Sequence, residues 1–213
     1  MTLDEAMLQT PIVAIIRGVT PDEVGPIAEA LHSAGVRLVE IPLNSPDPLE
    51  SLSRMVRDWK GRLFCGSGTV LSVGQAEAVA AAGGQFLVSP DCKPEVIRRT
   101  VELGLEPMPG FATSTEMFQA VDAGARYLKL FPAVTYGPAH VSSLKPVVPK
   151  GVTIMAVGGV GAGIMADWWA AGTRGFGMGG EIYKPGHTAE QVFEKAKTVV
   201  AAMRKLVPGE LVA

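Results

Sequence analysis

A two-part pattern repeats along almost the whole chain, and no other feature constrains the fold as strongly. In each repeat, a short run of apolar and β-branched residues precedes a longer stretch with helical spacing, and about eight repeats occur with a period of roughly 25 residues. Apolar runs this short are typical of parallel strands that are buried on both faces. The predicted strands are Ile12–Ile16, Leu38–Ile41, Leu63–Gly66, Phe86–Val88, Glu106–Met108, Tyr127–Leu130, Thr153–Ala156 and Gly175–Met178.

The stretches between the strands carry the signals that begin and end helices. Thr20 offers an N-cap hydroxyl, Pro21 suits the first helical position, and Asp22 and Glu23 add acids to the first turn. Several stretches end in a glycine such as Gly35, which readily adopts the left-handed conformation that closes a helix. The predicted helices start near Pro21, Pro48, Ser72, Pro94, Ser114, Pro138, Gly161 and Thr188.

Repeated strand–helix units build either an open doubly wound sheet or a closed (β/α)8 barrel. Eight units favour the barrel, and a length of 213 residues makes it a compact TIM barrel with few insertions. The sequence contains no low-complexity segment and no change of composition that marks a linker. We therefore expect a single α/β domain over residues 1–213.

The charge and composition of the chain exclude several classes of protein. Hydrophobic residues make up 47% of the chain, which is typical of a globular protein. The net charge is −2, which argues against a basic surface that binds nucleic acid or anionic membranes. The longest apolar runs fall far short of the roughly 20 residues that span a bilayer. Residues 1–9 lack the pattern of an export signal, so we expect a cytoplasmic protein with reduced Cys65 and Cys92.

One lysine near a strand end is the most informative residue, because functional residues of such barrels lie at the carboxyl ends of the strands. Lys129 lies in the sixth predicted strand with apolar residues on both sides. A buried lysine tends to lose its proton, and a neutral amine can attack a ketone to form an iminium ion. Alternatively, Lys129 could lie on an edge strand or extend its amine to solvent.

A carboxylate occupies a similar position in the second predicted strand. Glu40 lies between apolar residues, and a lone buried carboxylate is costly unless it is neutral or paired. Beside Lys129 it could move the protons that aldol chemistry requires. The alternative is a structural ion pair between Glu40 and Lys129.

Glycine pairs follow the last two predicted strands. Gly158 and Gly159 come after the seventh strand, and Gly179 and Gly180 come after the eighth. In many barrels these two loops bind phosphate through backbone N–H groups and a helix N-terminus. Glycine pairs also form ordinary tight turns, so it is their position that favours a phosphate site.

The remaining strand ends supply candidates for the rest of a substrate site. Arg17 ends the first strand and could bind a carboxylate through two hydrogen bonds, although surface arginines are common. Thr69 offers a hydroxyl after the third strand, and Pro90, Phe131 and Val157 follow or end other strands. No His or Cys cluster has metal-ligand spacing, which argues against a metal-dependent aldolase or epimerase.

Five segments, spread over most of the chain, match one known family. They are residues 15–21 (IIRGVTP), 39–46 (VEIPLNSP), 66–71 (GSGTVL), 128–132 (LKLFP) and 156–160 (AVGGV). Together they resemble the 2-keto-3-deoxy-6-phosphogluconate and -galactonate aldolases, from about Pro11 to Ala201. The resemblance implies a homotrimeric (β/α)8 barrel, a Schiff base on Lys129 and acid–base catalysis by Glu40. It also implies a pyruvate site near Thr69 and a phosphate site at the last two loops.

Within this family the chain resembles the galactonate branch. The gluconate enzymes usually carry an arginine four residues after the catalytic glutamate, where this chain has Asn44, and an arginine appears instead at Arg17. Val157 stands where the gluconate branch commonly has threonine, a change near the hydroxyls at which the two substrate epimers differ. Gly180 stands where the family often has serine, and the lost hydroxyl could weaken phosphate binding although the backbone donors remain.

The resemblance therefore implies a class I aldolase that reversibly cleaves 2-dehydro-3-deoxy-6-phosphogalactonate to pyruvate and glyceraldehyde 3-phosphate. No external cofactor is expected, because the lysine itself supplies the electrophile. One alternative is the gluconate epimer as substrate, or the use of both epimers. Others are a phosphosugar epimerase or isomerase, which would form no iminium ion, and a non-catalytic phosphosugar-binding barrel.

Overall fold

The apolar runs form nine parallel strands in the part of the chain that the computed structural model describes, residues 1–207. The last six residues of the predicted domain, 208–213, lie outside the described residues. The strands are β1 (Ile12–Ile15), β2 (Leu38–Pro42), β3 (Phe64–Gly68), β4 (Phe86–Val88), β5 (Glu106–Met108), β6 (Gly110–Phe111), β7 (Tyr127–Leu130), β8 (Thr153–Val157) and β9 (Gly175–Met178).

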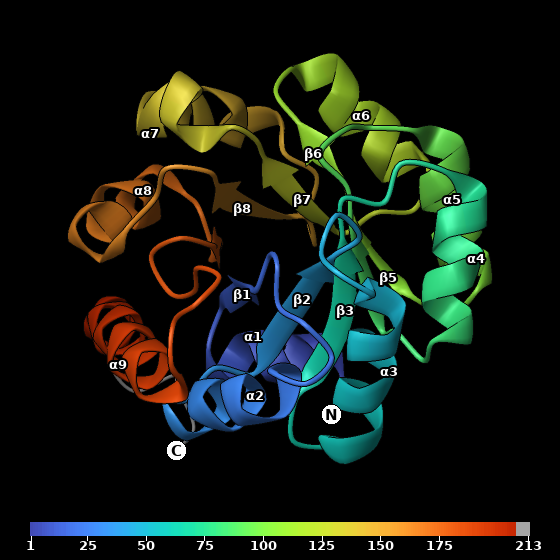
Figure 1. Cartoon of the computed structure of the whole chain (residues 1–213). Coiled ribbons are helices and arrows are strands. Elements are labelled where there is room, and N and C mark those ends of the chain that lie inside the picture. Colours follow the sequence, from blue (N-terminus) through green and yellow to red (C-terminus); the bar gives the residue numbers. More distant parts are fainter. Residues whose placement is uncertain (208–213) are drawn as a thin grey trace.

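The stretches between the strands form helices around the outside of the sheet (Figure 1). Short 3-10 helices cover Lys145–Val147 and Ala162–Ile164. The α-helices are α1 (Leu3–Gln9), α2 (Val24–Ser33), α3 (Pro48–Asp58), α4 (Val73–Ala81), α5 (Pro94–Glu102), α6 (Ser114–Asp122), α7 (Ala133–Leu144), α8 (Met165–Ala171) and α9 (Ala189–Leu206).

The sheet closes into a barrel through one interrupted strand. Its order is β5-β4-β3-β2-β1-β9-β8-β7-β6, and only Pro109 separates β5 from β6. The fifth predicted strand, Glu106–Met108, is β5, and β6 is a further segment that was not predicted. Proline has no N–H to donate to a strand ladder, so Pro109 interrupts the strand between the two segments. The Pro109 carbonyl nevertheless accepts a hydrogen bond from the Lys129 N–H at 2.9 Å, which joins this position to β7. The predicted (β/α)8 barrel is confirmed, with β5 and β6 sharing the fifth position.

Two apolar layers hold the barrel together. One lies between the strands and the surrounding helices, and the other fills the barrel interior. The interior layer includes Leu3, Ala6 and Met7 of α1, which pack with Phe86 and Met155 across the end opposite the carboxyl ends of the strands. The sequence analysis missed this seven-residue helix, which begins with a capping box. Among residues 1–207, no helix has the length and apolarity of a bilayer span.

Three α-helices begin away from their predicted positions. Helix α8 starts at Met165 rather than near Gly161, because the 3-10 helix Ala162–Ile164 precedes it. Residues 21–23 form a turn, and α2 starts at Val24. Within this turn the Glu23 carboxylate accepts hydrogen bonds from the Thr20 N–H and hydroxyl at 3.0 and 2.8 Å. Helix α7 starts at Ala133 rather than near Pro138. It is kinked at Gly137, whose φ of 73° no ordinary helical residue adopts.

Candidate active site

A cavity of about 660 Å³ lies at the carboxyl ends of the barrel strands. Its lining combines strand ends from around the whole barrel, although the residues are far apart in the sequence. All eleven residues that the sequence analysis singled out for the site line this cavity: Arg17, Glu40, Thr69, Pro90, Lys129, Phe131, Val157, Gly158, Gly159, Gly179 and Gly180.

Lys129 lies on an internal strand of the barrel, between β6 and β8. Successive side chains of a strand point to opposite faces, so Lys129 shares the barrel interior with Tyr127, while Leu128 and Leu130 pack toward the helices. The lysine is only 7% exposed, and its Nζ lies 4.4 Å from the centre of the Phe131 ring. It is therefore neither an edge-strand lysine nor one that extends into solvent.

Glu40 lies in the middle of β2 and also points into the barrel interior. It is 2% exposed, and its Oε2 has no hydrogen-bond partner among residues 1–207. The neighbouring strand β3 makes room for it, because a Cβ at Gly68 would lie 2.6 Å from Glu40 Oε2. Gly68 therefore leaves the space that the Glu40 carboxyl group occupies in the cavity wall.

Burial shifts both residues toward their neutral forms. It lowers the pKa of Lys129, an effect that the Glu40 carboxylate opposes and the Arg17 guanidinium reinforces. It raises the pKa of Glu40, although Lys129 and Arg17 both act in the opposite direction. In the described part of the chain, the Lys129 amine and the Glu40 carboxylate are separated by more than the 4.0 Å of an ion pair. The two groups thus face one cavity without a direct contact, so a structural ion pair does not account for them.

Arg17 is held at the mouth of the cavity by the loop after β2. Its guanidinium donates a hydrogen bond to the side-chain carbonyl of Asn44. The next residue in each loop adds a second contact, because the Gly18 N–H donates to the Ser45 hydroxyl at 2.9 Å. Asn44, which carries no charge of its own, therefore orients the cation on the neighbouring loop.

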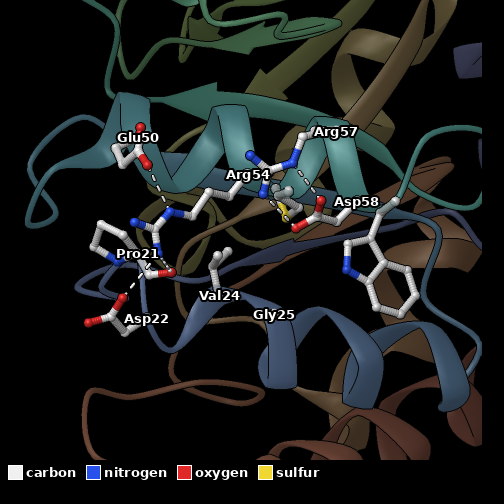
Figure 2. A pocket seen from close by; sticks show the side chains of 10 residues that line it. Pro21, Asp22, Val24, Gly25, Glu50, Arg54, Arg57 and Asp58 are labelled. Atoms are coloured by element: carbon white, nitrogen blue, oxygen red, sulfur yellow. Dashed lines mark hydrogen bonds and ion pairs between the residues drawn. The ribbon is translucent and has the colours of Figure 1, made fainter.

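A further contact anchors the same loop from outside the barrel (Figure 2). Arg54 on α3 donates to the Pro21 carbonyl at 3.1 Å and pairs with Asp22 at 3.0 Å and with Glu50 at 2.8 Å. These residues line a separate cavity of about 460 Å³ between α2 and α3. These contacts of the Arg54 guanidinium tie α3 to Pro21 and Asp22, at the end of the loop that carries Arg17.

Thr69 has an unusual backbone conformation directly after β3. Its φ is 60°, in the left-handed region that a β-branched residue rarely adopts. Such strain persists only where the surrounding structure enforces it, and it concentrates at functional sites. Strand β3 ends at Gly68, and Thr69 lines the cavity directly after it.

The loop after β8 is shaped by its glycine pair. Gly158 and Gly159 have φ values of 94° and 77°. A Cβ at Gly159 would lie 2.6 Å from the Cβ of Val134, so α7 packs directly against the loop backbone. The loop therefore offers backbone rather than side chains to this part of the cavity.

Eight residues of the lining were not singled out from the sequence. Half of them belong to the loop after β9, in which only Gly179 and Gly180 were predicted to bind the substrate. That loop folds back over the loop after β1, since a Cβ at Gly18 would lie 2.7 Å from Pro185 Cγ. The eight residues are Ile15, Gly18, Val160, Gly177, Glu181, Tyr183, Lys184 and Pro185.

Comparisons with known proteins agree with this fold. The family model for KDPG and KHG aldolases matches residues 3–197. The chain is 42% identical over 197 residues to the 2-dehydro-3-deoxy-6-phosphogalactonate aldolase of Escherichia coli strain K12, covering 92% of this chain and 96% of the relative. It is 40% identical over 203 residues to a probable enzyme of the same name from Rhizobium meliloti strain 1021, covering 95% and 96%.

A solved structure described as native KDPGal superimposes with a TM-score of 0.91 at 41% identity, over 93% of this chain and 97% of that one. The resemblance inferred from the sequence motifs is thereby confirmed. The chain belongs to the KDPG and KHG aldolase family.

Proposed function

We propose that the chain is a class I aldolase that cleaves 2-dehydro-3-deoxy-6-phosphogalactonate reversibly to pyruvate and glyceraldehyde 3-phosphate. The observation that carries the proposal is Lys129, a buried lysine whose pKa is lowered and which faces the carboxyl group of Glu40 across one cavity. An amine that is neutral near physiological pH is the nucleophile that a Schiff-base aldolase requires. The alignment with this chain covers 96% of the length of each of the two galactonate relatives, which supports the choice of substrate.

In the cleavage direction, the Lys129 amine attacks the C2 carbonyl carbon and the carbinolamine loses water to give an iminium ion. Glu40 then accepts the proton of the C4 hydroxyl as the C3–C4 bond breaks. The bonding electrons pass into the iminium, which leaves an enamine on Lys129 and releases glyceraldehyde 3-phosphate. Protonation at C3 and hydrolysis of the iminium release pyruvate and regenerate the amine. Glu40 is the group that gives and takes these protons, directly or through water.

The rest of the cavity suits the two anionic ends of this substrate. Arg17 and Thr69 bind the carboxylate, while the glycine backbones after β8 and β9 bind the phosphate. Val157, which is 6% exposed, offers only apolar contact where the hydroxyl-bearing carbons lie. The homotrimer implied by the resemblance and the cytoplasmic location expected from the sequence remain predictions.

Borohydride reduction in the presence of pyruvate, followed by peptide mass spectrometry, tests the proposal. We expect one reduced adduct, on Lys129. An epimerase, an isomerase or a non-catalytic barrel would give no adduct. Cleavage rates measured side by side on the galactonate and gluconate epimers then decide the substrate, and we expect the galactonate epimer to have the higher kcat/KM. Equal rates would establish dual specificity instead.

Arg17→Ala tests the orientation of the substrate. The loss of one charge-assisted hydrogen bond, worth roughly 1.5–3 kcal/mol, should reduce kcat/KM by on the order of tenfold to a few hundredfold. In the synthesis direction the apparent KM for pyruvate should rise, because pyruvate carries the carboxylate. The KM for glyceraldehyde 3-phosphate should change little. A defect confined to the aldehyde would mean that Arg17 serves the phosphate.

A further inference from the structure

One cation of the active-site cavity has no role in the mechanism above. Three cationic residues line the cavity, and two are accounted for: Lys129 forms the Schiff base and Arg17 binds the carboxylate. The third is Lys184, an exposed residue of the loop after β9. We propose that the Lys184 ammonium binds the phosphate of the substrate and makes the enzyme selective for phosphorylated aldehydes. This inference rests on the proposed function.

The turn that follows β9 brings Lys184 back over the glycine pair. The Gly179 carbonyl accepts hydrogen bonds from the N–H groups of Ile182 and Tyr183 at 2.8 and 2.9 Å, which reverses the chain within a few residues. A Cβ at Gly180 would lie 3.3 Å from Lys184 Cε, so the end of the lysine side chain passes directly over this glycine. The ammonium and the backbone donors of the loop therefore border the same part of the cavity.

The charges around this loop are consistent with a phosphate ligand. A phosphate monoester carries about −1.5 to −2 charges at pH 7, more than neutral backbone donors offset alone. Glu181 also lines the cavity, but its carboxylate leans toward the loop after β8, because a Cβ at Gly161 would lie 3.1 Å from Glu181 Cδ. In residues 1–207, no carboxylate lies within 4.0 Å of the Lys184 amine. The ammonium is therefore not neutralised by an ion pair and can meet an anion.

The experiment compares Lys184→Gln with Lys184→Arg, and uses Lys195→Gln as the control. Lys195 is an exposed lysine of α9 that does not line the cavity. Each enzyme condenses pyruvate with glyceraldehyde 3-phosphate and, separately, with unphosphorylated glyceraldehyde. In Lys184→Gln, we expect the KM for glyceraldehyde 3-phosphate to rise about tenfold, which is the size of effect expected when one partly exposed charge-assisted contact is lost. The kcat/KM for unphosphorylated glyceraldehyde should stay at the parent value. The Ki of inorganic phosphate as an inhibitor should rise in parallel.

Salt and charge provide two further readouts. Lys184→Arg should retain the parent KM for glyceraldehyde 3-phosphate, because it keeps the positive charge. Added salt screens exposed charges, so it should reduce the difference in this KM between the parent enzyme and Lys184→Gln. An unchanged KM for glyceraldehyde 3-phosphate, or equal losses with both aldehydes, would overturn the assignment of Lys184. A rise in the KM for pyruvate instead would assign Lys184 to the carboxylate. Absence of any aldol product from the parent enzyme would overturn the proposed function itself.

Discussion

Lys129→Ala is expected to abolish both the pyruvate adduct and cleavage of the sugar acid. Without the amine no iminium ion forms, so the electrons of the breaking C–C bond have no acceptor. We expect the cleavage rate to fall by on the order of 10⁴-fold or more, as when other covalent nucleophiles are removed. Rates are measured by coupled assay of pyruvate release, and adducts by mass spectrometry after borohydride reduction.

Inactivity of the Lys129 variant must be separated from misfolding, and Lys129→Met provides the control. Because burial lowers the pKa of Lys129 in the folded chain, the unfolded chain binds the proton more tightly. At any pH below the unfolded-state pKa, this difference destabilises the fold. An apolar side chain of similar volume removes that cost, so the Tm of Lys129→Met should equal or exceed that of the parent. Full activity in either variant, or an adduct on Lys93 or Lys145, would disprove the role of Lys129.

Glu40→Gln is expected to lower turnover by roughly a hundredfold or more, the usual contribution of a positioned acid–base group. Glutamine is nearly the same size and fits beside Gly68, but it cannot exchange protons. The variant should remain folded, because an amide does not incur the burial cost that raises the pKa of Glu40. Single-turnover cleavage measured against the parent enzyme checks this result, and a parent-like rate would leave Glu40 with a structural role only.

The same variant shifts the pH dependence of adduct formation in a defined direction. The Glu40 carboxylate raises the pKa of Lys129, in opposition to burial. Its removal should therefore lower the pKa of Lys129 further, so that the neutral amine persists to lower pH. The acidic limb of the borohydride-trapping profile with pyruvate should move to lower pH in Glu40→Gln. Movement toward higher pH would show that the two groups do not interact as described.

The barrel and the inward direction of Glu40 and Lys129 were predictable because both depend on local patterns. Short apolar runs with glycines between them predicted the strand positions, and the two-residue period of a strand directs Glu40 and Lys129 to the same face as Leu38 and Tyr127. A charged residue in such a run is costly, so Glu40 and Lys129 were candidates either for chemistry or for a structural ion pair. These features depend on residues close together in the sequence.

The remaining features depend on contacts between distant segments. Helix α1 has too few residues for its period to stand out, and it is stabilised by packing against the barrel interior together with its capping box. The interruption at Pro109 depends on two different neighbours, because β5 pairs with β4 and β6 pairs with β7. Neither the packing of α1 nor this pairing can be predicted from residues close together in the sequence.

The sequence by itself determined the repeating units, the barrel, and the positions of Lys129 and Glu40 on its inner face, because periodicity and burial cost act locally. Only the tertiary structure decided how the loops contact one another. Arg17 donates a hydrogen bond to Asn44, Pro185 packs against Gly18, and the Lys184 side chain passes over Gly180. Loops lack the hydrogen-bonded period of strands and helices, so their positions follow from the closed barrel that brings the first and last strands together.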